Sequence, residues 1–260
     1  MKSSLEVRID GALVAPAEVD DWERRRARVV LAKLRRMLEV ETPTDRDPDD
    51  LPSQRDELRR LKDMAGRDRL RELLKGDTRV AGWLTKPAVW FSGSRRKQCV
   101  VEMKVAGCSA QQISQGIDDL MVVDTAGNQR DNLAACPDHY LLEPRGMVLE
   151  VIETTGGSPL PAQFFLRFGD QSGLKTPRDP SYPYESAGTA RLADGMVIGG
   201  VPHQFRDEAD GAHARLMCEF PALTPNSMIR QHQWHLACEW SHWLRDIQHR
   251  VGARVPPAER

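Results

Sequence analysis

From Pro87 to the C-terminus, strand-like segments alternate with turn residues until one long helical segment closes the chain. Segments rich in β-branched and aromatic residues, bounded by Gly, Pro or Asp, predict five strands. They are residues 98–107, 146–157, 162–170, 195–208 and 212–221. Helical spacing predicts a helix over 109–120, capped by Ser109, and a longer one over 226–250. This order favours an α+β helix-grip fold, in which a curved antiparallel sheet wraps around the final helix and leaves a cavity.

Two connections refine this expectation. Asp210 and Gly211 separate the last two strands. Both residues tolerate the positive φ of a two-residue type I′ turn, so they predict a hairpin at this point. Residues 171–188 predict a long loop, at the mouth of the cavity or elsewhere on the surface.

The first third of the chain predicts a charged helical hairpin. Apolar residues recur every three or four positions in residues 17–40, and a proline- and aspartate-rich break follows. Ser53 is in position to cap a second helix. We therefore divide the chain into a helical extension, residues 1–85, and the helix-grip domain, residues 86–260. The extension is expected either to cover a pocket or to support a homodimer.

Charge argues against two classes of partner. The arginine-rich run from Arg24 to Arg36 is flanked by acids such as Asp20, Asp21 and Glu39, which favours a solvated helix face over a phosphate-binding surface. The formal net charge of the whole chain is −1. Global electrostatics therefore favours neither nucleic acid nor an anionic membrane as a partner, and any basic effect must be local.

The cysteines and the N-terminus predict a cytoplasmic protein. The five cysteines form no C-x-x-C pair and are odd in number, which fits reduced structural thiols better than disulfides. Residues 1–20 lack the features of a signal peptide, and no apolar run approaches the roughly 20 residues that span a bilayer.

Polar side chains recur along one stripe of the last predicted helix. The stripe comprises His232, His235, Glu239, His242 and Asp246, and the neighbouring stripe comprises Leu236, Trp240, Trp243, Ile247 and Val251. If the apolar stripe faces the sheet, His235 and Glu239 stand one turn apart at the edge of the cavity. A nitrogen and a carboxylate at this spacing can share one metal ion.

A catalytic zinc ion requires further ligands from elsewhere in the chain. The candidates are His139, Glu150 or Glu153, and His203, with Asp138, His213 and Asp170 as weaker ones because they lie at expected turns or strand ends. A simpler interpretation is that the helix carries solvated histidines and core tryptophans. A di-iron carboxylate site would need a second E-x-x-H besides Glu239-x-x-His242, and the sequence has none.

The order of several motifs resembles a known family. "MKVAGCSAQQI", "PDHYLL", "VIETTGG", "VPHQFRDEADGAHARLMCEF" and "HLACEWSHWL" occur in the order typical of the 2,4-diacetylphloroglucinol hydrolases, which include phloretin hydrolase. The resemblance covers roughly residues 98–250. It implies a helix-grip fold related to START-like lipid carriers. It also implies a zinc ion held by His139, Glu153, His235 and Glu239, with His203 assisting catalysis.

The chain departs from that family in places. The interval between His139 and Glu153 is short, which keeps Glu150 as a rival ligand. The family's phenol-binding tyrosines and asparagine have no clear match among Tyr140, Asn132, Tyr182 and Tyr184, and the charged N-terminal hairpin is not a family feature.

The resemblance implies a zinc-dependent hydrolase that cleaves the carbon–carbon bond between an acyl group and a phenolic or polyketide-like ring. Its partner would be a small aromatic or polyketide-like substrate, with no nucleic acid and no membrane, and a homodimer is an open alternative. A metal-free START-like carrier or sensor of a small apolar ligand is the main competing hypothesis. An adaptor that binds through the N-terminal arginines is the third.

Overall fold

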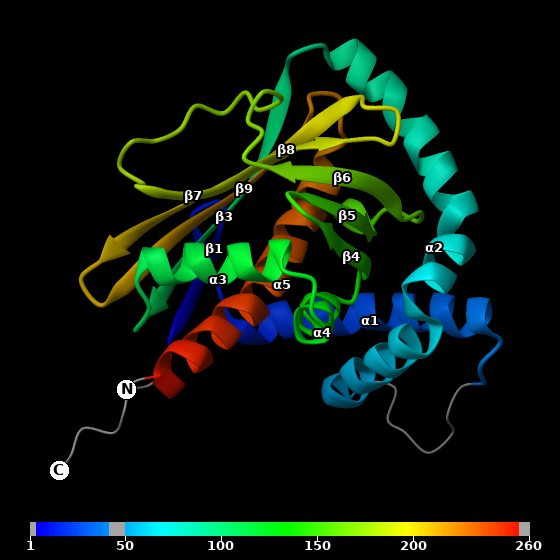
Figure 1. Cartoon of the computed structure of the whole chain (residues 1–260), viewed down its shortest axis with the longest axis horizontal. Coiled ribbons are helices and arrows are strands. Elements are labelled where there is room, and N and C mark those ends of the chain that lie inside the picture. The colour runs from blue at the N-terminus through cyan, green and yellow to red at the C-terminus, as the bar shows by residue number, and fades with distance from the viewer. Residues whose placement is uncertain (1–3, 42–49, 255–260) are drawn as a thin grey trace.

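The computed structural model describes residues 4–41 and 50–254. Its centre is a curved nine-stranded sheet in the order β2-β1-β3-β9-β8-β7-β6-β5-β4, in which all neighbours are antiparallel (Figure 1). The strands are β1 (Leu5–Ile9), β2 (Ala12–Val14), β3 (Arg96–Ala106), β4 (His139–Arg145), β5 (Val148–Glu153), β6 (Ala162–Phe168), β7 (Tyr184–Arg191), β8 (Val197–Glu208) and β9 (Gly211–Pro221).

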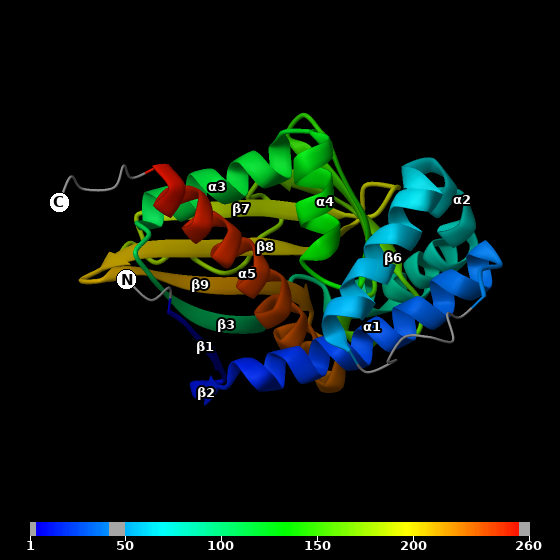
Figure 2. The ribbon, with the colours of Figure 1, turned by 90° about the horizontal axis from the view of Figure 1, so that it is seen from below.

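The C-terminal helix α5 (Asn226–Arg254) lies against this sheet, beside the shorter helices α3 (Ala110–Val122) and α4 (Ala126–Ala134) (Figure 2). The main core joins α5 residues such as Trp240, Trp243 and Leu244 to sheet residues such as Val101 and Met103. Burying these side chains removes a large apolar area from water, which is the main force holding helix and sheet together. The structure confirms the predicted helix-grip fold and the core position of these tryptophans.

The N-terminal helices are α1 (Pro16–Leu38) and α2 (Leu51–Ser92). They form the predicted hairpin and share a second core with the outer face of β4 and β5, to which Tyr140 and Ile152 contribute. Asp50, not Ser53, caps α2, because its side chain accepts the backbone N–H of Ser53. Gly66, with φ of 69°, interrupts the helix.

The boundary expected at residue 85 falls inside α2. In addition, β1 pairs with β3 and therefore completes the main sheet from the N-terminal side of the chain. The helical extension and the helix-grip domain thus share elements.

The β8–β9 hairpin is confirmed, but its turn differs from the expected type I′. Glu208 pairs with Gly211, so the two loop residues are Ala209 and Asp210, and neither has a positive φ. Gly211 has another role: a Cβ at this position would lie 1.9 Å from the carbonyl oxygen of Val105. Glycine is needed here because β3 passes so close.

None of the described helices contains a stretch long and apolar enough to cross a membrane.

Candidate metal centre

Three elements bring four predicted ligands together. His139 is the first residue of β4 and Glu153 the last of β5, and the two are partners in the register of that strand pair. Helix α5 presents His235 and Glu239, one turn apart, toward the same point. All four side chains are buried.

The ligand atoms lie at distances suited to a single ion. Nε2 of His139 is 3.1 Å from Nε2 of His235 and 3.0 Å from Oε2 of Glu239. Nε2 of His235 lies 3.5 Å from Oε2 of Glu239 and 3.8 Å from Oε2 of Glu153, and the latter oxygen is 3.9 Å from Nε2 of His139. A tetrahedral zinc shell places its ligand atoms about 3.3–3.5 Å apart, so the four residues fit such an ion after small adjustments.

The outer nitrogens of both histidines are already engaged. Nδ1 of His139 donates to the carbonyl oxygen of Asn132 at 2.7 Å, and Nδ1 of His235 lies 3.7 Å from Sγ of Cys136. A carbonyl only accepts, so Nδ1 of His139 carries a proton, and in the neutral form of the ring the Nε2 lone pair points into the cluster. Such an outer hydrogen bond is the usual way in which proteins orient a histidine ligand.

The cluster also favours positive charge. Burial opposes ionisation of Glu239, but His235 and His139 outweigh it and hold the pKa of this carboxyl well below its usual range. Burial likewise opposes protonation of the two histidines, yet the carboxylates and Cys136 raise the pKa of both His139 and His235. Burial raises the pKa of Glu153. The shifts of Glu239, His139 and His235 indicate that the site stabilises positive charge, either as protons on the rings or as a metal ion.

Two other groups of side chains lie close enough to hold an ion. Cys136, His139 and His235 each offer a ligand atom within 4.8 Å of the others, as do Glu23, Cys238 and His242. Cys136 faces the outer nitrogen of His235, away from the carboxylates. Glu23 is already held by two hydrogen bonds from Arg55, at 2.6 and 2.7 Å, which leaves its charge compensated.

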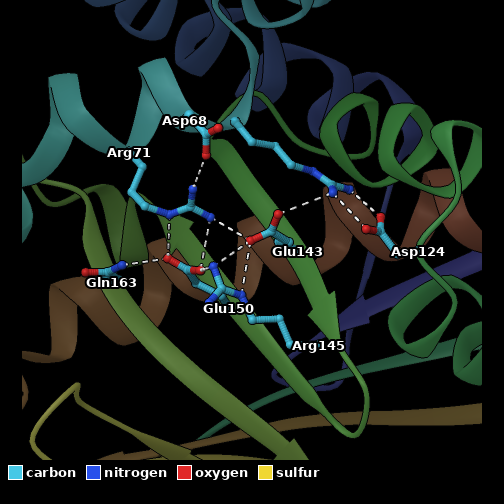
Figure 3. A network of polar contacts seen from close by, with 8 residues as sticks. Asp68, Arg71, Asp124, Glu143, Arg145, Glu150 and Gln163 are labelled. Atoms are coloured by element: carbon cyan, nitrogen blue, oxygen red, sulfur yellow. Dashed lines mark hydrogen bonds and ion pairs between the residues drawn. The ribbon is translucent and has the colours of Figure 1, made fainter.

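The rival ligand Glu150 belongs to a different environment. It pairs with Arg71 and Arg145 and accepts a hydrogen bond from Gln163, in a network that also includes Glu143 (Figure 3). Successive residues of a strand point to opposite sheet faces, so residues three apart cannot share a face. Glu153 therefore faces α5, and Glu150 faces the arginines of α2.

Two adjacent chambers border the cluster. An inner chamber of about 100 Å³ is lined by Glu153, Glu239 and His203 and by apolar side chains that include Trp240 and Trp243. An outer chamber of about 370 Å³ extends to the inner side of α2, where Ala81, Leu84, Thr85 and Ala88 form its wall. The two share six lining residues, which are Glu153, Phe164, Leu166, Val201, Cys218 and His232. The C-terminal half of α2 thus covers a pocket, which is one of the two roles considered for the N-terminal extension.

His203 and His232 border the cluster without joining it. Nδ1 of His203 accepts the backbone N–H of Met217 at 3.0 Å, so Nε2 carries the proton of the neutral ring, and burial lowers the pKa of His203 to about 4. His232 lines both chambers, and its Nδ1 has no hydrogen-bond partner within residues 4–41 and 50–254. Burial lowers the pKa of His232 to about 3. The sequence placed His232 on the polar stripe but did not single it out as a site residue.

The remaining candidates lie elsewhere. Asp138 forms a buried ion pair with Arg26, and Asp170 forms an ion pair with Arg191. Nδ1 of His213 is hydrogen-bonded to the Tyr182 hydroxyl, and His242 contacts Glu23. The residues considered for phenol binding, which are Tyr140, Asn132, Tyr182 and Tyr184, line neither chamber.

No protein-family model and no curated protein matches the chain. Among solved structures, the crystal structure of Ara h 8.0201 resembles it with a TM-score of 0.35 and 11% identity, over 62% of this chain and 100% of that one. Protein Ms6760 from Mycobacterium smegmatis resembles it with a TM-score of 0.30 and 7% identity, over 62% of this chain and 93% of that one. Likeness at this level identifies neither a family nor an activity.

Proposed function

We propose that the protein is a zinc-dependent hydrolase that cleaves the carbon–carbon bond between an acyl group and a phenolic or polyketide-like ring. The observation that supports this most is the convergence of two imidazole nitrogens and two carboxylates, all buried, at the wall of the inner chamber. Nitrogen and oxygen ligands of this kind suit zinc, and we favour this set over one with Cys136, because Cys136 contacts the far side of the His235 ring.

The overall reaction would add water across the bond. The carbonyl carbon gains the hydroxyl group and becomes a carboxylic acid, while the ring carbon leaves with the bonding electron pair and takes up a proton. Bound zinc would polarise the carbonyl and lower the pKa of water.

Side chains of the inner chamber would stabilise the developing negative charge and hold the ring of the substrate. Nε2 of His203 carries a proton and would donate a hydrogen bond to the oxygen of a bound acyl group, where negative charge develops. Because its Nδ1 already accepts the backbone N–H of Met217, the neutral His203 ring is placed to donate a hydrogen bond from Nε2 rather than to accept a proton. Trp240 and Trp243 would seat the ring and exclude bulk water.

A metal-free carrier or sensor of a small apolar ligand is the second candidate. The size and apolar walls of the outer chamber favour it, as does the absence of the candidate tyrosines from both chambers among the described residues. In that case the four polar residues would orient the ligand or serve the fold.

Turnover of acylphloroglucinols and simpler aryl ketones by zinc-loaded protein distinguishes the two. We expect release of the carboxylic acid and the deacylated ring, lost in Glu239→Gln and kept in Asp246→Asn, a matched acid on the same helix outside the cluster. Binding of these compounds without turnover, and with equal affinity in both variants, would contradict the hydrolase and support the carrier.

A further inference from the structure

The outer face of the C-terminal half of α2 carries a row of large apolar side chains exposed to solvent. Val80, Trp83, Leu84, Trp90 and Phe91 are 49%, 70%, 57%, 75% and 73% exposed. With the exposed Pro87 they follow a spacing of three or four residues, which places them on one helical stripe. Figure 1 shows this part of α2 at the outer edge of the molecule. A contiguous stripe of this kind marks an interaction site more often than a free surface.

The charged residues in the segment that carries this stripe are all basic. Residues 78–101 contain five basic residues, Arg79, Lys86, Arg95, Arg96 and Lys97, and no acidic one. Within the described residues only Lys86 has an ion-pair partner, Asp194 at 2.7 Å. The side chains of Arg95 and Arg96 contact backbone carbonyls nearby. This segment therefore carries a local excess of positive charge, although the net charge of the whole chain is close to zero.

The adjoining side of the same helix forms the wall of the outer chamber. Ala81, Thr85 and Ala88 line the chamber, and Leu84 both lines it and is exposed at the surface. One helix thus borders both an apolar exterior surface and an apolar interior space.

We propose that this stripe docks the protein onto an anionic lipid surface, from which an apolar ligand reaches the outer chamber. An amphipathic helix with tryptophan and phenylalanine on one face and basic residues beside them binds at the lipid–water interface, where aromatic rings bury their apolar part and cations meet anionic headgroups. A second copy of the chain fits less well, since a symmetric contact through the stripe would bring the basic residues against their own copies without acids to pair them. This proposal does not depend on the hydrolase activity.

Co-sedimentation of the full chain with vesicles tests the proposal. We expect binding to vesicles of phosphatidylcholine mixed with phosphatidylserine, weak binding to phosphatidylcholine alone, and weakening by added salt. Trp90→Ser/Phe91→Ser should reduce binding at least about tenfold, since both side chains lose their burial in lipid. Arg79→Gln/Arg95→Gln should remove the preference for anionic vesicles. Val123→Ser/Met147→Ser, which removes exposed apolar residues elsewhere on the surface, should bind like the wild type.

Three outcomes would overturn the proposal. The first is no binding of folded wild-type protein to anionic vesicles. The second is equal binding to neutral and anionic vesicles. The third is a wild-type dimer in analytical ultracentrifugation that Trp90→Ser/Phe91→Ser dissociates, with no vesicle binding, which would assign the stripe to a second copy of the chain.

Discussion

The Nε2 atoms of His139 and His235 face each other at 3.1 Å, with two carboxylates beside them and little water-accessible surface. Polar groups this close in an apolar interior cost free energy unless a cation or protons are shared among them. A single divalent ion would satisfy all four side chains at once.

Cobalt(II) replacing zinc would report which atoms coordinate. We expect visible d–d bands of a tetrahedral nitrogen and oxygen site, without the near-ultraviolet charge-transfer band that a thiolate ligand gives. Cys136→Ser should leave the spectrum unchanged, whereas Glu239→Gln should lower metal affinity by at least about 100-fold, because loss of even an outer partner costs 10–100-fold. A sulfur-to-cobalt band that disappears in Cys136→Ser would contradict the proposed ligand set.

His203 should stay neutral across the physiological range. Burial lowers its pKa to about 4, and the hydrogen bond from Met217 selects the tautomer with the proton on Nε2. Nitrogen-15 NMR of the histidine rings should therefore show His203 as the neutral Nε2–H form from pH 8 down to about pH 5. Titration of this ring between pH 6 and 7 would argue against a fixed donor.

Helical spacing in the sequence predicts two of the four proposed ligands without any family resemblance. The one-turn spacing of His235 and Glu239 places both on one face of α5. The choice of Glu153 over Glu150 follows from strand alternation once the strand is known, since Leu149 and Val151 face the main core on the same side as Glu153. The approach of His139 depends on the register of β4 and β5, which no local pattern reveals. Its assignment as a ligand came from family resemblance.

At the scale of elements, the N-terminal helices hold the segment that leads from α4 to His139. Lys62 of α2 is buried and donates to the carbonyl oxygens of Leu133 and Pro137, at 3.1 and 3.2 Å. Arg26 of α1 makes a two-point contact with Asp138, at 2.7 and 2.8 Å. The segment that ends at the proposed ligand is therefore fixed from both helices of the hairpin.

Lys62→Met should loosen this loop. We expect the free energy of unfolding to fall by about 1–3 kcal/mol at neutral pH, because several buried carbonyls lose their donor. Metal affinity should fall by about tenfold, as for other outer partners of a metal site. Chemical denaturation and metal titration measure the two effects, and an unchanged affinity would contradict the positioning role of Lys62.

The same residue gives a pH dependence of defined sign. Burial lowers the pKa of Lys62 to about 8 from 10.5. Between these values the unfolded chain binds a proton that the folded chain does not, so the contribution of Lys62 to stability should rise with pH across that window. Comparison of wild type with Lys62→Met at pH 7 to 10 should show the rise only in the wild type. Parallel plots of unfolding free energy against pH for the two proteins would contradict this role of Lys62.

Some elements were missed for identifiable reasons. Asp10 and Gly11, with φ of 51° and 78°, form the two-residue connection between β1 and β2, where an Asp-Gly pair does adopt the positive φ that was expected at Asp210. Strand β4 contains Pro144, which its position at the edge of the sheet tolerates. Strand β7 carries Ser186, Ala187 and Gly188, which have weak strand preference and are fixed by pairing with β8.

At the scale of the whole molecule, α2 and the curved sheet together enclose a space that neither forms alone. The outer chamber has walls from α2, β6 and β8 and shares Glu153 with the lining of the inner chamber. The alternation of strands and a final helix predicted the sheet and α5. It did not predict that α2 covers the outer chamber, since the packing of α2 depends on contacts distant in sequence.

Ala88→Trp should fill part of the outer chamber. Because the added indole occupies space lined by apolar side chains, we expect about tenfold weaker binding of an apolar fluorescent probe, with little change in stability. Lys75→Trp, at an exposed position of the same helix, is the matched control. Equal probe affinity in the two variants would show that ligands do not use this chamber.

Metal content of the purified protein, measured by elemental analysis after zinc is supplied, tests the central claim most directly. The wild type is compared with His235→Ala/Glu239→Gln and with His249→Ala/Asp246→Asn, which likewise alters one histidine and one carboxylate on the same helix but outside the cluster. We expect one zinc ion per chain in the wild type and the control, and none in the cluster variant, with all three folded by circular dichroism. Wild-type protein without stoichiometric metal, or a cluster variant that retains it, would contradict a zinc centre formed by these four residues.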